Sequence, residues 1–213
     1  MTSDQSPIPL APVRARCERC LRPRSACICA WIDPVAGAAS LLILQHPMEV
    51  AHAKGSARLL HLSVAGSVMV TGEVFEPRAL HALLHGDGRV PLLLYPALAG
   101  ERALGVPAPP ALPPLDDPAQ LRLVVLDGTW RKSRKMLFQN PLLHALPRFP
   151  LTQAPATHYA IRKAHAPDQL STLEASCLAL ARLEQAPQRY ARLLERFDDF
   201  VACYQATGGR LAR

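Results

Sequence analysis

Four of the six cysteines lie in one short stretch, with the spacing Cys17-x2-Cys20-x6-Cys27-x-Cys29. Four thiolates this close in sequence can surround one tetrahedral Zn²⁺, and a C-x2-C arm commonly places two sulfurs on one ion. A disulfide framework is less favoured, because the N-terminal residues contain no apolar segment of the kind that directs export. The sequence therefore predicts a structural zinc knuckle held by all four sulfurs, with free or redox-active thiols as the alternative.

A knuckle of this size cannot bury a core, so its folding energy would come from the bound metal. The flanking arginines would help to keep the thiols deprotonated. Because a four-sulfur site is closed, we expect no catalytic role for these cysteines. The two remaining cysteines, Cys177 and Cys203, are expected to be buried small hydrophobes.

A second group of residues that could form a ligand site is Asp127-Gly128-Thr129-Trp130, which follows a continuous apolar run. Glycine lets a backbone approach a ligand closely, and tryptophan offers a stacking face for a base or a cation. The structural alternative is a helix N-cap at Asp127 or Thr129 beside a packed tryptophan. The basic run 131–135 follows at once, and a ligand site beside a basic patch is more specific than either feature alone.

The positive charge of the chain is concentrated in two places. With 24 Lys and Arg against 17 Asp and Glu, the chain has an excess of +7, which suits a polyanionic partner such as nucleic acid. Genome composition could explain the amount of arginine, but it does not explain the placement. The excess lies around the cysteines, at 14–24, and around the Asp-Gly-Thr-Trp turn, at 122–135.

A third group of polar residues stands near the C-terminal third, at 159–163 and 169–174. Ser171 or Thr172 with Glu174 matches a capping box at the start of a helix, whose free N–H groups could also bind a ligand carboxylate. Among the scattered histidines, His46 is of interest because it follows a strand. The sequence has no G-x-G-x-x-G, Walker or G-x-S-x-G motif, so a classical nucleotide or hydrolase site lacks support.

Short apolar strands alternate with helical segments and must position these groups. We expect strands at 40–45, 68–71, 91–95, 121–126 and 158–162, and helices at 48–62, 78–85, 131–139, 171–185 and 187–204. Continuous apolar strands separated by helices favour a parallel α/β sheet. Ligands of such sheets bind beyond the carboxyl ends of the strands, where Gln45-His46-Pro47, Tyr95-Pro96 and the Asp-Gly-Thr-Trp turn all fall.

Length and composition limit the domain organisation. A chain of 213 residues that is 49% hydrophobic and 19% charged fits one domain with a small appendage. No apolar run approaches the roughly 20 residues that span a bilayer, and we expect a soluble cytoplasmic protein. The expected division is a disordered leader at 1–13, a four-cysteine zinc knuckle at 14–32 and an α/β catalytic domain at 33–213, with an extended proline-rich segment at 105–118.

Taken in order, the motifs resemble those of the DTW-domain family. They are the paired cysteines, LQHPxE at 44–49, LYP at 94–96, LDGTW at 126–130, YxIRK at 159–163 and LSTLEA at 170–175. The resemblance extends over nearly the whole chain from Arg16 onward. Members of this family are tRNA-uridine aminocarboxypropyltransferases, named for their Asp-x-Thr-Trp signature.

The resemblance implies a SPOUT-like fold, which has a mainly parallel sheet, flanking helices and a C-terminal trefoil knot. It also implies transfer of the 3-amino-3-carboxypropyl group of S-adenosylmethionine to N3 of a tRNA uridine, with release of methylthioadenosine. The protein would contribute mostly orientation, because the arm of the donor that faces the nucleophile decides the product.

The resemblance also implies the site residues. The donor would be held by Tyr95, Pro96, Leu126, Gly128, Thr129, Trp130, Ser171, Thr172 and Glu174. The tRNA phosphates would be contacted by Arg131, Lys132, Arg134, Lys135, Arg162 and Lys163. We expect Asp127 to accept the imide proton of the uridine, and its alternative role is to orient the donor or the loop.

Two other functions stay open at this point. One is a SPOUT-type RNA methyltransferase that also uses S-adenosylmethionine, and the other is a non-catalytic zinc-containing RNA-binding protein. The sequence leaves open which uridine and which tRNAs are modified, whether the knuckle contacts RNA, and what the oligomeric state is.

Overall fold

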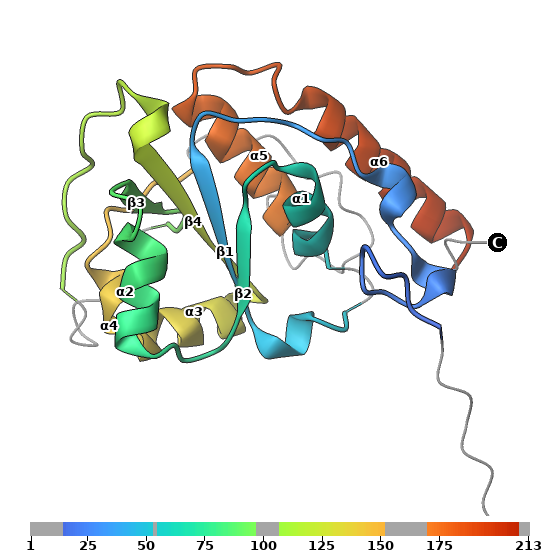
Figure 1. The fold of residues 1–213 in the computed structure, drawn as a ribbon, viewed down its shortest axis with the longest axis horizontal. Helices are drawn as coiled ribbons and strands as arrows, with labels where there is room; N and C mark the ends of the chain where they lie inside the picture. Colours follow the sequence, from blue (N-terminus) through green and yellow to red (C-terminus); the bar gives the residue numbers. More distant parts are fainter. Residues whose placement is uncertain (1–14, 53–54, 97–106, 152–169, 209–213) are drawn as a thin grey trace, which may run out of the picture.

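Four parallel strands form the framework of the protein in a computed structural model, which describes residues 15–52, 55–96, 107–151 and 170–208 (Figure 1). The sheet has the order β2-β1-β4-β3. Its strands are β1 (Ser40–Gln45), β2 (Val68–Thr71), β3 (Val90–Leu93) and β4 (Leu121–Asp127). This confirms the expected parallel α/β architecture, while the strand expected at 158–162 lies outside the described residues.

The two central strands, β1 and β4, are buried along almost their whole length. Their near-continuous aliphatic sequences suit this position, because a parallel sheet is covered on both faces. The register pairs Gln45 with Asp127 at the carboxyl end. Since residues paired across neighbouring parallel strands point to the same face, these two polar side chains meet at the edge of the sheet.

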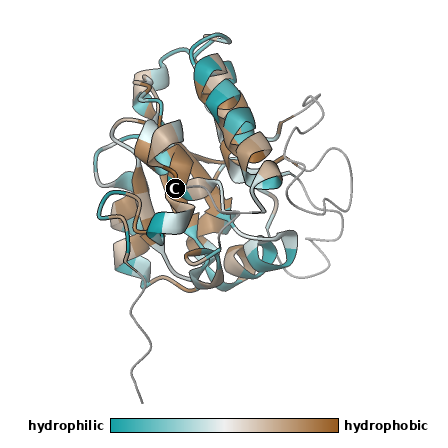
Figure 2. Cartoon of the chain, turned by 90° about the vertical axis from the view of Figure 1, so that its right-hand side faces the viewer, coloured by the Kyte–Doolittle hydropathy of each residue, from teal (hydrophilic) through white to brown (hydrophobic). Residues whose placement is uncertain are grey.

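Helices cover both faces of the sheet. One face carries α1 (Ala57–Ser63), α5 (Thr172–Leu183) and α6 (Ala191–Ala206), and the other carries α2 (Pro77–His85), α3 (Trp130–Gln139) and α4 (Pro141–His144) (Figure 1). Alternate residues of β1 and β4 enter the two cores, so that Leu41 and Ile43 pack on the α5 side and Leu42 and Leu44 on the α3 side. Figure 2 shows the apolar strands between these helices, whose outer faces are hydrophilic.

Single 3-10 turns complete the structure: η1 (Arg24–Ala26), η2 (Cys29–Trp31), η3 (Pro47–Glu49) and η5 (Pro118–Gln120). Residues 107–117 form neither helix nor strand, as expected for the proline-rich segment. In the described part of the chain, no helix is long and apolar enough to cross a membrane.

Two of the expected helices were wrong in extent, and one helix was missed. The expected helix at 48–62 is reduced to η3 and α1, because His46 caps a tight 3-10 turn that opens with Pro47. The terminal helix begins at Ala191 rather than at residue 187, because residues 186–191 form i→i+3 turns first. The short α4 was not expected, since one helical turn carries no periodic signal.

Candidate functional site

Asp127 occupies the centre of the carboxyl edge of the sheet and is only 5% exposed. Gln45 Nε2 donates to its Oδ2 at 2.9 Å, and the Thr172 hydroxyl donates to its Oδ1 at 2.7 Å. Its backbone carbonyl accepts from the amide of His46 at 2.9 Å. Asp127 thus connects β1, β4 and α5. Each carboxylate oxygen thus accepts a hydrogen bond from a different segment of the chain.

The turn after Asp127 is held by local bonds. Thr129 is the N-cap of α3 and accepts from the amide of Lys132 at 3.4 Å, which confirms the N-cap alternative for this residue. A Cβ at Gly128 would lie 3.1 Å from Cβ of Lys132 and 3.7 Å from Cβ of His46. Glycine therefore allows the turn to pass close to both α3 and the loop after β1.

An aromatic pair lies beside the turn. Trp130 is 51% exposed although it is large and apolar, and its ring stands edge-on to that of Tyr95 with 5.8 Å between centroids. The guanidinium of Arg148 lies 5.2 Å from the centroid of the Tyr95 ring. Tyr95 thus supports Trp130 at the edge of the sheet, where the exposed part of the indole is open to a ligand.

The first turn of α5 faces the same edge. Ser171 accepts from the amide of Glu174 at 3.1 Å, and Glu174 accepts from the amide of Ser171 at 2.7 Å. This reciprocal pair confirms the expected capping box. The next residue, Thr172, reaches Asp127, so the structure brings together the Asp-Gly-Thr-Trp turn and the start of α5 as predicted.

Acidic residues neutralise two of the lysines of the basic run. Lys132 Nζ lies 2.8 Å from Glu49 Oε1, and the Glu49 side chain is 1% exposed. Lys135 Nζ lies 2.6 Å from Glu73 Oε1. Hydrogen bonding from the Lys135 ammonium holds the pKa of Glu73 below its ordinary value. These two lysines are therefore less available to phosphate than the sequence suggests.

The other predicted RNA contacts differ from one another. Arg131 and Arg134 are exposed and form no ion pair with a described residue, and Arg134 lies 5.5 Å from the ring centroid of Phe138. Arg162 and Lys163 lie outside the described residues. Arg122, at the start of the second basic cluster, bonds to Asp87 and to backbone carbonyls of α2, so its charge is used within the fold.

Sequence reasoning did not assign a role to the buried polar residues Gln45 and Glu49 or to Glu73. The first two belong to the LQHPxE motif, so a run of polar residues directly after a buried strand was the available signal. His46 accepts from the amide of Met48 through Nδ1 at 3.2 Å, which leaves its ring proton on Nε2. That nitrogen lies 3.7 Å from Glu73 Oε1, so the ring faces the carboxylate.

The four N-terminal cysteines form one compact cluster. All four sulfurs lie within 4.8 Å of one another, with 3.6 Å between Cys17 and Cys29 and 3.8 Å between Cys20 and Cys27. Tetrahedral zinc with Zn–S bonds of about 2.3 Å requires sulfurs about 3.8 Å apart. The donor set and its spacing therefore fit Zn²⁺.

The surroundings of the sulfurs also suit a metal. Hydrogen bonds from the backbone amides of Cys20 and Arg19 lower the pKa of Cys17 to about 6, whereas burial raises the pKa of Cys29 to about 12. Bound zinc would keep all four sulfurs as thiolates. Elsewhere, Cys177 is fully buried, as expected, and the burial raises its pKa, while Cys203 near the end of α6 is only half-buried.

The cysteine knuckle packs onto the α/β domain instead of standing apart. Cys20 and Ile28 belong to the core that includes α5 and α6. Trp31 packs edge-on against Phe200 of α6 with 5.5 Å between centroids. In addition, Arg22 Nη2 donates to the carbonyl of Gly55 at 2.5 Å. These contacts fix the knuckle close to the loop that follows β1.

Comparison with known proteins agrees with this arrangement. The family model described as "DTW domain" matches residues 14–205. A Drosophila melanogaster protein named tRNA-uridine aminocarboxypropyltransferase 2 is 33% identical over 182 residues, covering 82% of this chain and 69% of its own length. The Mus musculus protein of the same name is 26% identical over 84% of this chain and 60% of its own length.

A plant protein shows the same similarity over a shorter region. The Arabidopsis thaliana tRNA-uridine aminocarboxypropyltransferase A is 26% identical over 58% of this chain and 50% of its own length. No solved structure matches the chain significantly. The chain thus spans between half and about two thirds of the length of these relatives.

Proposed function

This chain belongs to the DTW-domain family, and from this premise we propose that it transfers the 3-amino-3-carboxypropyl group of S-adenosylmethionine to N3 of a tRNA uridine. The names of the relatives support the group and the acceptor. In the proposed reaction a bond forms between N3 and the aminocarboxypropyl carbon as the bond from that carbon to sulfur breaks. Methylthioadenosine leaves, and the imide proton passes to a base. The observation that carries the proposal is the buried Asp127 beside the exposed face of Trp130.

The donor would bind at the carboxyl edge of the sheet, against Tyr95, Pro96, Leu126, Gly128, Thr129 and Trp130 on one side and the start of α5 on the other. The residues present fit such a ligand. Half of Trp130 is exposed, which offers a face for adenine or for the sulfonium methyl group. The positive end of the α5 dipole favours the donor carboxylate. Ser171 and Glu174 would act by holding this helix end in place through their capping box.

Asp127 is proposed as the acceptor of the uridine proton. Its carboxylate is fixed by Gln45 and Thr172, each of which bonds to one of its oxygens. A base held in this way loses little freedom when the substrate arrives. The same bonds would let Asp127 orient the donor or the loop, the alternative role.

Membership of this family also leads us to propose the fold class, the bound metal ion, the tRNA contacts and the cellular location. The strand order β2-β1-β4-β3 and the packing of α5 against β4 support a SPOUT-like fold with a C-terminal trefoil knot. The cysteine cluster would hold a structural Zn²⁺. The exposed Arg131 and Arg134, together with Arg162 and Lys163, would contact tRNA phosphates. With a tRNA as substrate, we expect the reaction to occur in the cytoplasm.

The experiment is incubation of the purified protein with S-adenosylmethionine and unmodified tRNA transcripts, followed by mass spectrometry of nucleosides and by-products. We expect a uridine that is heavier by one aminocarboxypropyl group, with methylthioadenosine formed in equal amount. S-Adenosylhomocysteine with a methylated nucleoside would instead identify a methyltransferase. Unchanged nucleosides, with tRNA still bound, would identify a non-catalytic RNA-binding protein.

A further inference from the structure

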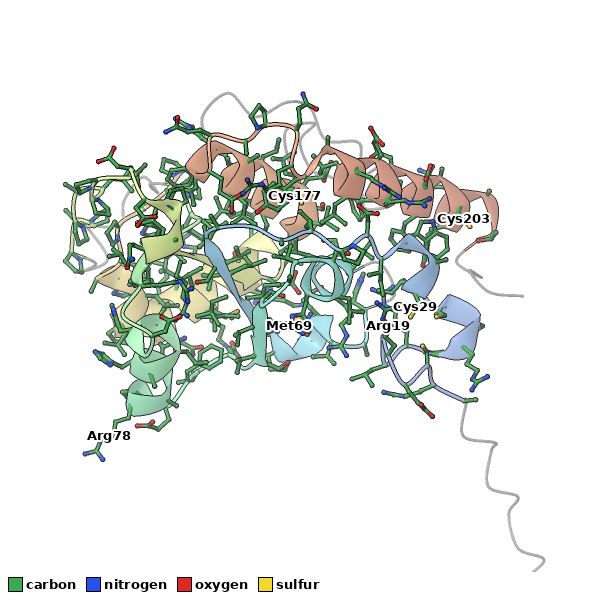
Figure 3. All side chains as sticks on the ribbon, turned by 45° about the horizontal axis from the view of Figure 1, so that its top comes forward. Arg19, Cys29, Met69, Arg78, Cys177 and Cys203 are labelled. Carbon is green, nitrogen blue, oxygen red and sulfur yellow. The ribbon has the colours of Figure 1, made fainter. Side chains whose placement is uncertain are left out.

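A cleft of about 330 Å³ separates the cysteine knuckle from the carboxyl end of β1. It is lined by Arg16 and Arg22 of the knuckle, by Arg58 of α1, and by Gln45 and Glu49. In Figure 3 this region lies between Met69 on β2 and the knuckle that carries Arg19 and Cys29. Its volume is at the lower end of the range of small-ligand pockets.

We propose that this cleft binds the phosphodiester backbone of the tRNA next to the target uridine, through the guanidinium groups of Arg16 and Arg58. The assignment rests on the proposed function, and it concerns a part of the substrate that the Asp-Gly-Thr-Trp turn does not hold. The turn would bind the donor and the base, and the cleft would bind the adjoining backbone.

The positive charge of the cleft indicates that its ligand is an anion. Three arginines from two separate segments line one cleft, whereas the carboxylate in its lining, that of Glu49, pairs with Lys132. Guanidinium groups bind phosphate oxygens in a fixed fork geometry. S-Adenosylmethionine is a poor occupant, because it has no phosphate and its sulfonium is itself a cation.

Arg58 and Arg22 differ in their hydrogen bonding. The Nε of Arg58 is buried, and no described residue accepts a hydrogen bond from it. Arg22 is held in place by its bond to the Gly55 carbonyl, which fixes its guanidinium at the wall of the cleft. Since a buried guanidinium donor without an acceptor is costly, an oxygen-rich ligand would stabilise this arrangement.

The position of the cleft connects it with the catalytic edge. Gln45 lines the cleft while its Nε2 donates to Asp127, and Glu49 lines it while it pairs with Lys132 of α3. The amide of Gln45 has a second N–H that could bond to a uracil carbonyl. A nucleotide with its phosphate on the arginines would therefore present its base beside Asp127.

The test measures tRNA binding without turnover. Arg16→Gln and Arg58→Gln are compared with wild type by fluorescence anisotropy, with labelled unmodified tRNA transcripts at several salt concentrations and no donor. We expect each variant to bind about tenfold more weakly, and its salt slope to fall by about 0.7–0.9 for each phosphate that it no longer neutralises. Arg58→Lys, which keeps the charge without the planar fork, should fall between wild type and Arg58→Gln.

Arg78→Gln is the matched control, because exposed Arg78 on α2 lies at the opposite end of the molecule from the knuckle in Figure 3. It should bind tRNA like wild type, and all variants should bind S-adenosylmethionine equally in calorimetry. Unchanged affinity and salt slope in the Arg16 and Arg58 variants would overturn the assignment, as would an equal loss in Arg78→Gln.

The outcomes separate this assignment from the proposed reaction. If the arginine variants lose tRNA affinity but wild type forms no modified uridine, the reaction is wrong and the cleft assignment stands. If wild type modifies uridine and the arginine variants bind normally, the cleft assignment alone is wrong.

Discussion

Thr172 donates its hydroxyl hydrogen to Oδ1 of Asp127 across 2.7 Å, and so joins the first turn of α5 to the carboxyl end of β4. The two residues belong to motifs that stand far apart in sequence. Their bond makes the Asp-Gly-Thr-Trp turn and the capped start of α5 one structural unit. A donor bound between the turn and the helix would therefore contact groups whose relative position is already fixed.

Thr172→Val tests this bond, because valine keeps the shape and removes the donor. Because Asp127 then loses a hydrogen bond to its charged carboxylate, we expect the free energy of unfolding to fall by about 1.5–3 kcal/mol and kcat for aminocarboxypropyl transfer to fall as well. Urea denaturation and initial rates measure the two effects. Thr172→Ser is the control and should restore both, so equal stability of the valine and serine variants would contradict the prediction.

Asp127→Asn separates the two roles of the carboxylate. If Asp127 takes the uridine proton, kcat should fall by about 10²–10⁴-fold with little change in KM for the donor. An orienting role would raise KM for S-adenosylmethionine instead. We expect the loss in kcat, and steady-state kinetics with each substrate varied in turn measures it. A change confined to KM would show that the proton goes elsewhere.

The ion pair of Glu73 and Lys135 should make the stability of the fold decrease in acid. The Lys135 ammonium is the largest cause that lowers the pKa of Glu73 from its ordinary 4.5. Because the folded pKa is the lower one, the pair stabilises the fold fully above pH 4.5 and loses this effect as pH falls through the lowered pKa.

Glu73→Gln should accordingly be less stable than wild type at about pH 7 and approach it in acid, as measured by urea denaturation at a series of pH values. Lys135→Met should show the same trend, since it removes the other partner. A stability difference that persists unchanged at low pH would mean that the carboxylate charge is not its source.

Cys20→Ser tests the proposed metal site, because Cys20 is the most buried of the four clustered cysteines. Wild type should carry about one zinc per chain, and the variant should lose it together with part of its thermal stability. Elemental analysis and thermal denaturation measure these changes. Cys203→Ser, outside the cluster, should keep its zinc, and a wild-type protein that carries no metal would refute the site.

Local sequence predicted the strands well, because each of their signals is contained within a few residues. The ranges 40–45 and 68–71 match β1 and β2, since apolar runs there end at His46-Pro47 and at Gly72. The capping box at Ser171 was predicted for the same reason, as its two partners are three residues apart.

Contacts between distant segments were not predictable in this way. The bond of Gln45 to Asp127 depends on the register between β1 and β4, which a single sequence does not state. The pairing of Lys132 with Glu49 depends on how η3 meets α3. Some basic side chains that the sequence predicts to contact RNA are for this reason paired with acidic side chains inside the protein.

The chain has two tryptophans, and their different surroundings provide separate optical signals. Trp130 is half exposed at the proposed donor site, whereas Trp31 packs against Phe200 beside the knuckle. Addition of S-adenosylmethionine should therefore change the fluorescence of Trp130, and removal of zinc should change that of Trp31. Trp130→Phe should abolish the response to the donor and weaken its binding. The free energy of unfolding should change by only about 0.5 kcal/mol, because half of the side chain is exposed and phenylalanine keeps an aromatic ring beside Tyr95.

Trp31→Phe is the reciprocal control for the same titration. It should keep the full response to S-adenosylmethionine and lose the response to a zinc chelator, because the knuckle and the donor site involve different residues. If Trp130→Phe still shows the wild-type response to the donor, the indole does not contact it, and the donor must bind away from the Asp-Gly-Thr-Trp turn.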